Sequence, residues 1–214
     1  PGVTPMVLGH ESSGIVEAVG SDVSYVQPGD HVITCLSVFC GHCESCLTGH
    51  MSLCVNPETK RDADQEPRLS KGGAPVQQFA NLSSFAEQML IHEHALVKID
   101  KDMPLDRAAL IGCGVTTGVG AVFHTAAVEP GTTVAVIGCG GVGLSCINGA
   151  ALAGAGKIIA VDMVDSKLEM AKTFGATHTV NGKNGDSVQQ VMELSGGGVH
   201  YSFEAIGLKQ TAED

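Results

Sequence analysis

Short apolar runs and longer segments of helical periodicity alternate through the second half of the chain. The helical segments are 141–155, 166–174 and 187–195, and the apolar runs around them are 133–138, 157–162, 177–180 and 200–207. Strands that are buried on both faces have continuous apolar sequences, and helices between such runs are typical of a parallel sheet. We therefore predict a doubly wound α/β sheet with four strands before Asp214, whereas such sheets usually have about six.

The first half of the chain has shorter, β-rich runs separated by turn signals, a pattern typical of a small antiparallel barrel or sandwich. The runs and the turns between them are 14–20, 20–22, 27–30 and 30–38. Further along, the sequence predicts a polar surface loop at 57–73, a strand pair at 86–92 and 95–99, and helices at 106–111 and 117–127. This change from β-rich to helical sequence predicts a first domain at 1–115 and a second at 116–214.

Composition limits the function classes that fit the chain. With 214 residues, 43% of them hydrophobic and 16% charged, the chain is long and apolar enough for one or two globular domains. A net charge of −11 without a run of lysines or arginines argues against nucleic acid or an anionic membrane as a partner. No apolar run reaches the about 18 residues of a membrane span. Residues 1–8 lack a signal-peptide pattern, although the missing initiator Met leaves a lost leader open, and we expect a soluble, cytoplasmic protein.

A glycine-rich turn joins the first apolar run of the second half to the helix after it. Gly138-Cys139-Gly140-Gly141-Val142-Gly143 has the spacing G-x-G-x-x-G, and Asp162 ends the next run, nineteen residues after Gly143. In dinucleotide sites the first glycine makes the tight turn, the second admits the pyrophosphate, and the third lets helix and strand pack closely. Asp162 would accept hydrogen bonds from the ribose and repel a 2′-phosphate, which favours NAD over NADP. Lys167 is either a ribose contact or a solvated lysine, and a turn without a ligand is the alternative for the whole pattern.

Four of the eight cysteines fall within fifteen residues. Cys40, Cys43, Cys46 and Cys54 have the spacing of a metal-binding lobe, which we place at 36–56. Four thiolates suit the tetrahedral coordination of Zn²⁺ and leave no open position, so the predicted site is a structural zinc, with disulfide or redox use as the alternative. Reduced thiolates agree with a cytoplasmic location, and the remaining thiols expected in the core or free are Cys35, Cys139 and Cys146.

Several motifs occur together in the order found in one enzyme family. They are Gly9-His10-Glu11-Ser12-Ser13-Gly14, Val19-Gly20, Gly29-Asp30-His31-Val32, the four cysteines, Gly112-Cys113-Gly114 and the glycine turn. Together they resemble the zinc-containing medium-chain alcohol dehydrogenases, in particular the long-form, class III-like members, over essentially the whole chain. The resemblance implies a GroES-like, mostly-β catalytic domain at 1–115 and a partial Rossmann domain at 116–214. It also implies that sequence is missing at both ends.

The resemblance assigns catalytic roles to three residues. His10 and Cys113 match two ligands of the catalytic zinc, whose third ligand, a cysteine, would precede Pro1. Glu11 matches the acidic residue behind that zinc, where it can tune the metal. From the residues alone, His10 would be a strand-end histidine and Cys113 a buried thiol. Because a catalytic zinc needs three protein ligands, we expect this chain to bind about one zinc ion, in the four-cysteine site.

The resemblance also assigns residues to the cofactor and the substrate. Thr117 and Val142 match positions that face the nicotinamide, and packing between helices is the alternative. Leu36 and Phe79 match positions that line the substrate pocket, and burial in the core is the alternative. The histidines expected to be solvated at a strand end, not to bind metal, are His92 and His94.

The implied reaction is hydride transfer between an alcohol and NAD at a zinc ion. An apolar pocket favours a primary alcohol, aliphatic or aromatic, with an aldehyde as its product. Two alternatives stay open: S-(hydroxymethyl)glutathione as the substrate, as in the formaldehyde dehydrogenases of the family, and a non-catalytic fragment that binds zinc and the dinucleotide. The family also implies a homodimer or homotetramer, and we expect the truncated sheet to expose an apolar edge that aggregates or binds a partner.

Overall fold

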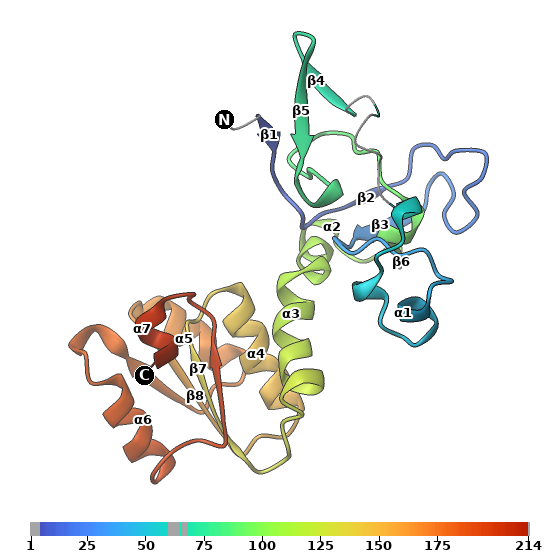
Figure 1. The fold of residues 1–214 in the computed structure, drawn as a ribbon. Helices are drawn as coiled ribbons and strands as arrows, with labels where there is room; N and C mark the ends of the chain where they lie inside the picture. Colours follow the sequence, from blue (N-terminus) through green and yellow to red (C-terminus); the bar gives the residue numbers. More distant parts are fainter. Residues whose placement is uncertain (1–4, 60–64, 66–67, 214) are drawn as a thin grey trace. The chain divides into compact units, whose positions relative to one another are not determined.

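The computed structural model describes residues 5–59, 65 and 68–213. The chain divides into two compact units, Pro1–Cys113 and Gly114–Asp214. Figure 1 shows short strands and turns in the first unit and a sheet flanked by helices in the second. The β-rich texture predicted for the first half and the α/β texture predicted for the second are therefore both present.

An antiparallel sheet of three strands contributes Val32 and Ile33 to the core of the first unit. Its strand order is β2 (Ser13–Ile15), β3 (His31–Thr34) and β6 (Leu96–Ile99). The central strand is buried from Val32 to Thr34, whereas both edge strands keep exposed positions, as expected of a sheet with one solvated face. Beyond Thr34, Cys35 donates its N–H to the Ala95 carbonyl oxygen at 2.8 Å, which carries the pairing toward the cysteine-rich lobe.

A second sheet contains a hairpin that the sequence did not predict. Its order is β1 (Met6–Val7), β5 (Ala74–Gln78) and β4 (Leu69–Lys71), with β1 parallel and β4 antiparallel to β5. The turn is Gly72-Gly73, with φ of +58° and +81°, a conformation that glycine adopts without strain. The predicted loop at 57–73 is therefore wrong at β4, whose exposed side chains are polar, and Pro57–Thr59 forms a 3₁₀ turn. Residues 60–64 and 66–67 of that loop lie outside the described part.

The predicted strand at 86–92 is wrong. This segment has no regular secondary structure, and a 3₁₀ turn, Glu93–Ala95, leads directly into β6. Side chains fasten it instead: Gln88 Nε2 donates to Glu17 Oε2 at 2.8 Å, and Glu93 accepts the N–H groups of Ser24 and Tyr25 at 3.0 and 2.8 Å. Ala, Glu and Gln have low strand propensity, so the few apolar residues of the run are a weak signal.

Two composite helices follow, as predicted at 106–111 and 117–127. In the first unit, α2 (Leu105–Ala108) continues as a 3₁₀ turn, Ala109–Gly112. In the second unit, α3 (Gly114–Gly120) continues as a π-helix, Ala121–Thr125. Among the described residues, no single helix has the length and apolar composition to cross a membrane; only these two neighbouring helical segments, taken together, reach them.

A four-stranded parallel sheet forms the second unit, and each predicted strand and helix is present. The strand order is β10 (Tyr201–Glu204), β7 (Thr133–Ile137), β8 (Lys157–Asp162) and β9 (His178–Asn181). The helices are α4 (Gly141–Leu152), α5 (Asp165–Thr173), α6 (Ser187–Ser195) and α7 (Lys209–Glu213). Because all four strands are parallel, the turn that follows β7 lies at the carboxyl edge of the sheet, where ligands bind in such folds.

Successive residues of the parallel strands enter two different cores. On one face, Ile158 and Ala160 of β8 pack with residues of α4 and α5, including Ile147 and Leu168. On the other face, the cluster of Ile159, Val161 and Val180 packs against Val191 and Leu194 of α6. Burial on both faces explains why these strands are apolar without alternation, and it confirms the doubly wound sheet.

Candidate metal and cofactor sites

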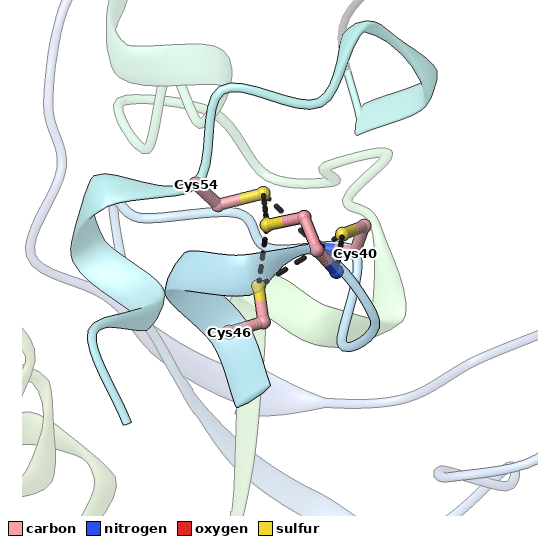
Figure 2. Close-up of side chains that lie close together, drawn as sticks. Cys40, Cys46 and Cys54 are labelled. Atoms are coloured by element: carbon pink, nitrogen blue, oxygen red, sulfur yellow. Dashed lines mark hydrogen bonds between the residues drawn. The ribbon is translucent and has the colours of Figure 1, made fainter. Parts of the chain in front are cut away.

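Four cysteine side chains converge in the lobe 36–56 (Figure 2). Cys43 Sγ lies 3.5 Å from Cys46 Sγ and 3.9 Å from Cys54 Sγ, and Cys40 Sγ lies 3.9 Å from Cys46 Sγ. All four sulfurs lie within 4.8 Å of one another, and all four cysteines are free. Sulfurs bound to one tetrahedral Zn²⁺ at about 2.3 Å would be about 3.8 Å apart. The cluster therefore fits a closed zinc site and not a pair of disulfides, whose sulfurs are about 2.05 Å apart.

Short turns bring the four thiols together. Cys43 caps helix α1 (Glu44–Leu47), which places Cys46 one turn later, and a 3₁₀ turn, Met51–Leu53, leads into Cys54. Two glycines with positive φ reverse the chain on either side of α1: Gly41 at +88° and Gly49 at +84°. The spacing of the cysteines is thus converted into convergence by elements only a few residues long.

Hydrogen bonds prepare one of the thiols for ionisation. Burial opposes ionisation of Cys40, but the backbone N–H groups of His42 and Cys43 and the side chain of Asn56 outweigh burial and lower the pKa of Cys40 to about 6. For Cys43, the Cys46 N–H favours the thiolate, but the Cys46 side chain and burial prevail and raise the pKa of Cys43 to about 11. A divalent cation at the centre removes this conflict, because every thiolate would then face a positive charge.

In the second unit, the glycine turn after β7 has the shape expected of a dinucleotide-binding loop. Gly138 has φ of +98°, which makes the tight turn, and its N–H continues the pairing of β7 with β8 by donating to the Val161 carbonyl oxygen at 2.8 Å. A Cβ on Gly143 would overlap the carbonyl oxygen of Gly138 and lie 2.9 Å from its carbonyl carbon. The first and last glycines are therefore required by the close approach of β7 and α4.

The two glycines between them are required by nothing in the chain itself. A Cβ on Gly140 or Gly141 would meet no atom within 4 Å, and both residues are exposed at the N-terminus of α4. This helix end carries unpaired N–H groups and a partial positive charge, which suit a phosphate. The space above these residues therefore has room for a bound group at the helix N-terminus.

Asp162 lies directly beside this turn. One carboxylate oxygen accepts the Cys139 N–H at 2.9 Å, and the other accepts the Val164 N–H at 2.9 Å. Lys167 Nζ lies 3.9 Å from Asp162, whose side chain is 10% exposed, while the lysine side chain is 51% exposed. Since a carboxylate has about four acceptor positions, Asp162 joins the two turns and keeps capacity for further donors.

In the second unit, the helix that carries Thr117, α3, packs closely against the helix that carries Val142, α4. A Cβ on Gly118 of α3 would lie 2.5 Å from the Val142 carbonyl oxygen and 2.5 Å from the Ser145 Cβ of α4. The helices therefore touch backbone to backbone at Gly118. Thr117, which is exposed, directly precedes this contact, and Val142 belongs to it.

The loop after β10 completes the border of the glycine turn, and sequence reasoning did not find it. Ile206 packs so closely on the turn that a Cβ on Gly138 would lie 2.6 Å from its Cγ1. Glu204 holds the loop by accepting the N–H groups of Ile206 and Gly207, each at 2.9 Å, and the Thr211 hydroxyl at 2.8 Å. The sequence offers no signal for this arrangement, because it depends on one carboxylate turning back onto its own loop.

We expect Glu204 to give the second unit a pH-dependent stability. The Thr211 hydroxyl and the N–H groups of the loop hold the pKa of Glu204 below its ordinary value of 4.5. A depressed pKa stabilises the fold fully above pH 4.5, and the contribution is lost as the pH falls through the folded value. Thermal unfolding from pH 7 to pH 3 should show a stability deficit of Glu204→Gln that closes at low pH. Glu193→Gln, on the exposed face of α6, is the control, and a deficit independent of pH would contradict the expectation.

In the first unit, the segment that carries His10 is clamped by a second turn. Gly9 has φ of +95°, and a Cβ there would lie 2.8 Å from Phe85 Cδ1. The Phe79 ring lies 5.6 Å from the His10 ring at an interplanar angle of 59°, and Phe79 and Leu36 are 39% and 44% exposed. The core alternative for these two predicted pocket residues is therefore wrong, since both side chains reach the surface of this unit.

The turn that presents Phe79 is strained. Ala80, Asn81 and Ser83 have φ of +52°, +57° and +56°, which is unusual for residues other than glycine. The buried Ser83 hydroxyl accepts the Phe79 N–H at 3.0 Å and donates to the Val7 carbonyl oxygen at 2.9 Å. Ser83 thereby ties the turn to the strand that leads to His10, a role that no motif in the sequence indicates.

The segments that carry His10 and Cys113 meet at one residue, Thr34. Ser12 Oγ lies 2.8 Å from Thr34 Oγ1, and the Thr34 N–H donates to the Ser12 carbonyl oxygen at 3.0 Å. From the other direction, a Cβ on Gly112 would overlap the Thr34 carbonyl oxygen. Residues far apart in sequence are thus anchored at the same end of β3.

The candidate ligands do not all converge. Within the described part of the chain, two groups of three or more ligating side chains have all their ligand atoms within 4.8 Å: the four cysteines, and Cys40 with His42 and Glu58. His10, Glu11 and Cys113 are not such a group. His92 and His94, which were predicted not to bind metal, have structural contacts. His94 Nδ1 lies 2.7 Å from the Phe39 carbonyl oxygen, and the His92 ring accepts the His94 N–H.

The remaining thiols behave as predicted. Cys139 and Cys146 are each 2% exposed, and burial raises the pKa of both thiols, that of Cys139 to about 11. Cys35 is half-buried and free. None of these three therefore belongs to either group of candidate ligands.

Comparison with known proteins now adds to this geometry. A family model described as alcohol dehydrogenase GroES-like domain matches residues 2–101, and one described as zinc-binding dehydrogenase matches residues 141–214. The alcohol dehydrogenase class-3 of Zea mays is 45% identical over an alignment of 213 positions that covers 96% of this chain and 56% of the relative. The chain belongs to the zinc-containing medium-chain alcohol dehydrogenase family. The predicted GroES-like and Rossmann parts are thereby confirmed.

Other members of the alcohol dehydrogenase family agree with this assignment. The S-(hydroxymethyl)glutathione dehydrogenase of Synechocystis sp. is 44% identical over 96% of this chain and 58% of its own length. Among solved structures, an alcohol dehydrogenase zinc-binding domain protein from Burkholderia ambifaria matches with a TM-score of 0.86 and 42% identity, over 97% of this chain and 58% of that one. The benzyl alcohol dehydrogenase of Acinetobacter calcoaceticus matches with a TM-score of 0.83 and 39% identity, over 99% and 58%. The chain thus spans somewhat more than half the length of these relatives.

Proposed function

We propose that this chain forms the zinc-binding and NAD-binding parts of an alcohol dehydrogenase that transfers hydride between an alcohol and NAD. The observation that carries the proposal is the glycine turn of the second unit. There, space lies open above Gly140 and Gly141 at a helix N-terminus, next to an acidic side chain, Asp162. Packing accounts for Gly138 and Gly143 but not for two further glycines at an exposed helix N-terminus, and family membership supports hydride chemistry at this place.

In this proposal the reacting alcohol binds in the first unit, at the segments that carry His10 and Cys113. A bound zinc would polarise the alcohol oxygen and NAD would accept the hydride. His10 and Cys113 are the ligands that this chain contributes, and their shared anchor at Thr34 supports that assignment. Glu11 would tune the metal, and the exposed Leu36 and Phe79 would line the pocket for an apolar tail.

The second unit would hold NAD through named contacts. Gly140 and Gly141 would accommodate the pyrophosphate, and Asp162, with Lys167 beside it, would bind the adenosine ribose. Thr117, which precedes Gly118 at the contact of α3 with α4, and Val142, which belongs to that contact, would face the nicotinamide. Asp162 would also repel a 2′-phosphate, which makes NAD the expected cofactor.

We expect Asp162→Asn to weaken NAD binding and to relax the preference against NADP. The carboxylate is the charged acceptor for the ribose, and an amide neither accepts as strongly nor repels a phosphate. The dissociation constant of NADH should rise roughly tenfold while that of NADPH falls, as measured by the fluorescence of the reduced cofactors. Asp165→Asn, the same change at the next turn, is the control. Equal selectivity in the wild type and Asp162→Asn would contradict the role of this residue.

Two substrate classes remain in competition. The apolar side chains of Leu36 and Phe79 favour a primary alcohol with an aliphatic or aromatic tail, and the relative from Acinetobacter calcoaceticus is named for benzyl alcohol. The name of the Synechocystis relative favours the alternative, S-(hydroxymethyl)glutathione. Activity of the full-length protein with NAD on short-chain alcohols, benzyl alcohol and the glutathione adduct decides between them. No turnover on any of the three, with zinc and NAD bound, would support the non-catalytic alternative.

Assembly and location follow from the same proposal. Leu47, Leu53 and Val55 are 74%, 62% and 76% exposed on the cysteine-rich lobe, and large apolar side chains exposed on one lobe suit a protein–protein contact. This supports the proposed homodimer or homotetramer, which sedimentation of the full-length protein tests. The cytoplasmic location stays a prediction, based on the need to keep the four thiols reduced.

A further inference from the structure

A second group of metal-ligating side chains borders the four-cysteine cluster and shares one ligand with it. The ligand atoms of Cys40, His42 and Glu58 all lie within 4.8 Å of one another. His42 Nε2 lies 3.1 Å from Glu58 Oε1, close to the about 3.3 Å that separates nitrogen and oxygen ligands of one tetrahedral zinc. The two side chains are 63% and 53% exposed, so this group opens to solvent.

Hydrogen bonds with Asn56 hold the His42 side chain and the Glu58 backbone. Asn56 Oδ1 accepts the Glu58 N–H at 3.1 Å, which orients the amide so that its Nδ2 donates to His42 Nε2 at 3.2 Å. Asn56 thus holds His42 Nε2 beside Glu58 Oε1, and a metal ion bound there would take the place of the Asn56 donor on the nitrogen.

A closed site needs a route by which its metal enters. Four thiolates around zinc leave no open coordination position, whereas three protein ligands leave one for water or an incoming ligand. We propose that Cys40, His42 and Glu58 form a second, open zinc site through which zinc enters and leaves the four-cysteine site. This inference rests on the proposed structural zinc, but not on catalysis.

The transfer of zinc from the open site to the four-cysteine site only exchanges ligands, and zinc stays Zn²⁺ throughout. Zinc held by Cys40, His42 and Glu58 loses its bonds to the imidazole nitrogen and the carboxylate oxygen as bonds to the sulfurs of Cys43, Cys46 and Cys54 form. Any proton on these three thiols passes to solvent, as metal binding to thiols requires. Cys40 remains bound throughout, because it is the ligand that the two sites share.

The test measures the rates and the equilibrium of zinc binding separately. The apo chain is mixed with zinc in a stopped-flow instrument, release is followed into excess chromophoric chelator, and affinity is measured by competition. Both side chains of the variants His42→Ala and Glu58→Gln are exposed, so their substitution leaves the fold intact. The matched controls are His50→Ala and Glu44→Gln, two exposed residues of the same lobe outside the group.

We expect loading and release to slow together by roughly tenfold in both variants, a barrier increase of about 1.4 kcal/mol, with unchanged affinity and unchanged controls. Unchanged rates would overturn the entry route. Faster release with weaker affinity would also overturn it, since His42 and Glu58 would then only support the bound state. If the wild type binds no zinc at a ratio of one per chain, the four-cysteine site itself fails, and that outcome is distinct from the other two.

Discussion

Removal of zinc from the four-cysteine site is expected to unfold the lobe 36–56 while the parallel sheet of the second unit stays folded. The lobe has only one four-residue helix, α1, and a 3₁₀ turn, and its large side chains Leu47, Leu53 and Val55 are exposed. With so little core, the lobe depends on metal binding, which contributes about 10 kcal/mol or more in small zinc domains. Hydrogen exchange of the holo protein, before and after chelation, should show protection lost across Cys43–Cys54 and kept in β7 and β8.

The corresponding substitution is Cys46→Ser, which removes one ligand without changing the size of the side chain. We expect it to abolish stoichiometric zinc binding and to reproduce the exchange pattern of the chelated protein. Cys35→Ser makes the same change at a free thiol of the same unit and should bind zinc normally. Protection of the lobe that survives both chelation and Cys46→Ser would show that the fold, and not the metal, holds these residues.

The elements predicted most accurately are those whose environment leaves a periodic mark on the sequence. Strands β7 and β8 are buried on both faces, so their apolar runs give their positions almost to the residue. The hairpin strand β4 is exposed and polar, and the segment 86–92 is fastened by side chains of Gln88 and Glu93. Neither environment imposes a period on the sequence, so the first was missed and the second was mistaken for a strand.

The candidate sites divide in the same way. The four-cysteine cluster and the glycine turn are local, so spacing alone predicts their geometry. The junction of Ser12, Thr34 and Gly112 joins segments about a hundred residues apart, and only the fold reveals it. The left-handed residues around Ser83 have no sequence signature, because glycine is the only residue that marks such a conformation reliably.

Gly143→Ala is expected to destabilise the second unit by more than about 4 kcal/mol, the range reserved for substitutions that the core cannot accommodate. The added methyl would overlap the Gly138 carbonyl oxygen and lie 3.5 Å from Val136 Cγ1, so β7 and α4 would have to move apart. The carbonyl belongs to the backbone of the tight turn and cannot rotate away as a side chain would. Denaturant unfolding followed by circular dichroism measures the loss, and NADH binding should disappear with it.

Gly140→Ala separates the stability of the turn from its function. Its methyl would meet no protein atom within 4 Å, and its φ of −82° and ψ of −170° are allowed for alanine. We expect a loss of about 1 kcal/mol or less, from replacing an N-cap glycine. The methyl would occupy the space proposed for the pyrophosphate, so the NADH dissociation constant should rise roughly tenfold or more in a folded protein. If Gly140→Ala bound NADH normally, the opening above this residue would not be the cofactor site, even with Gly143→Ala behaving as expected.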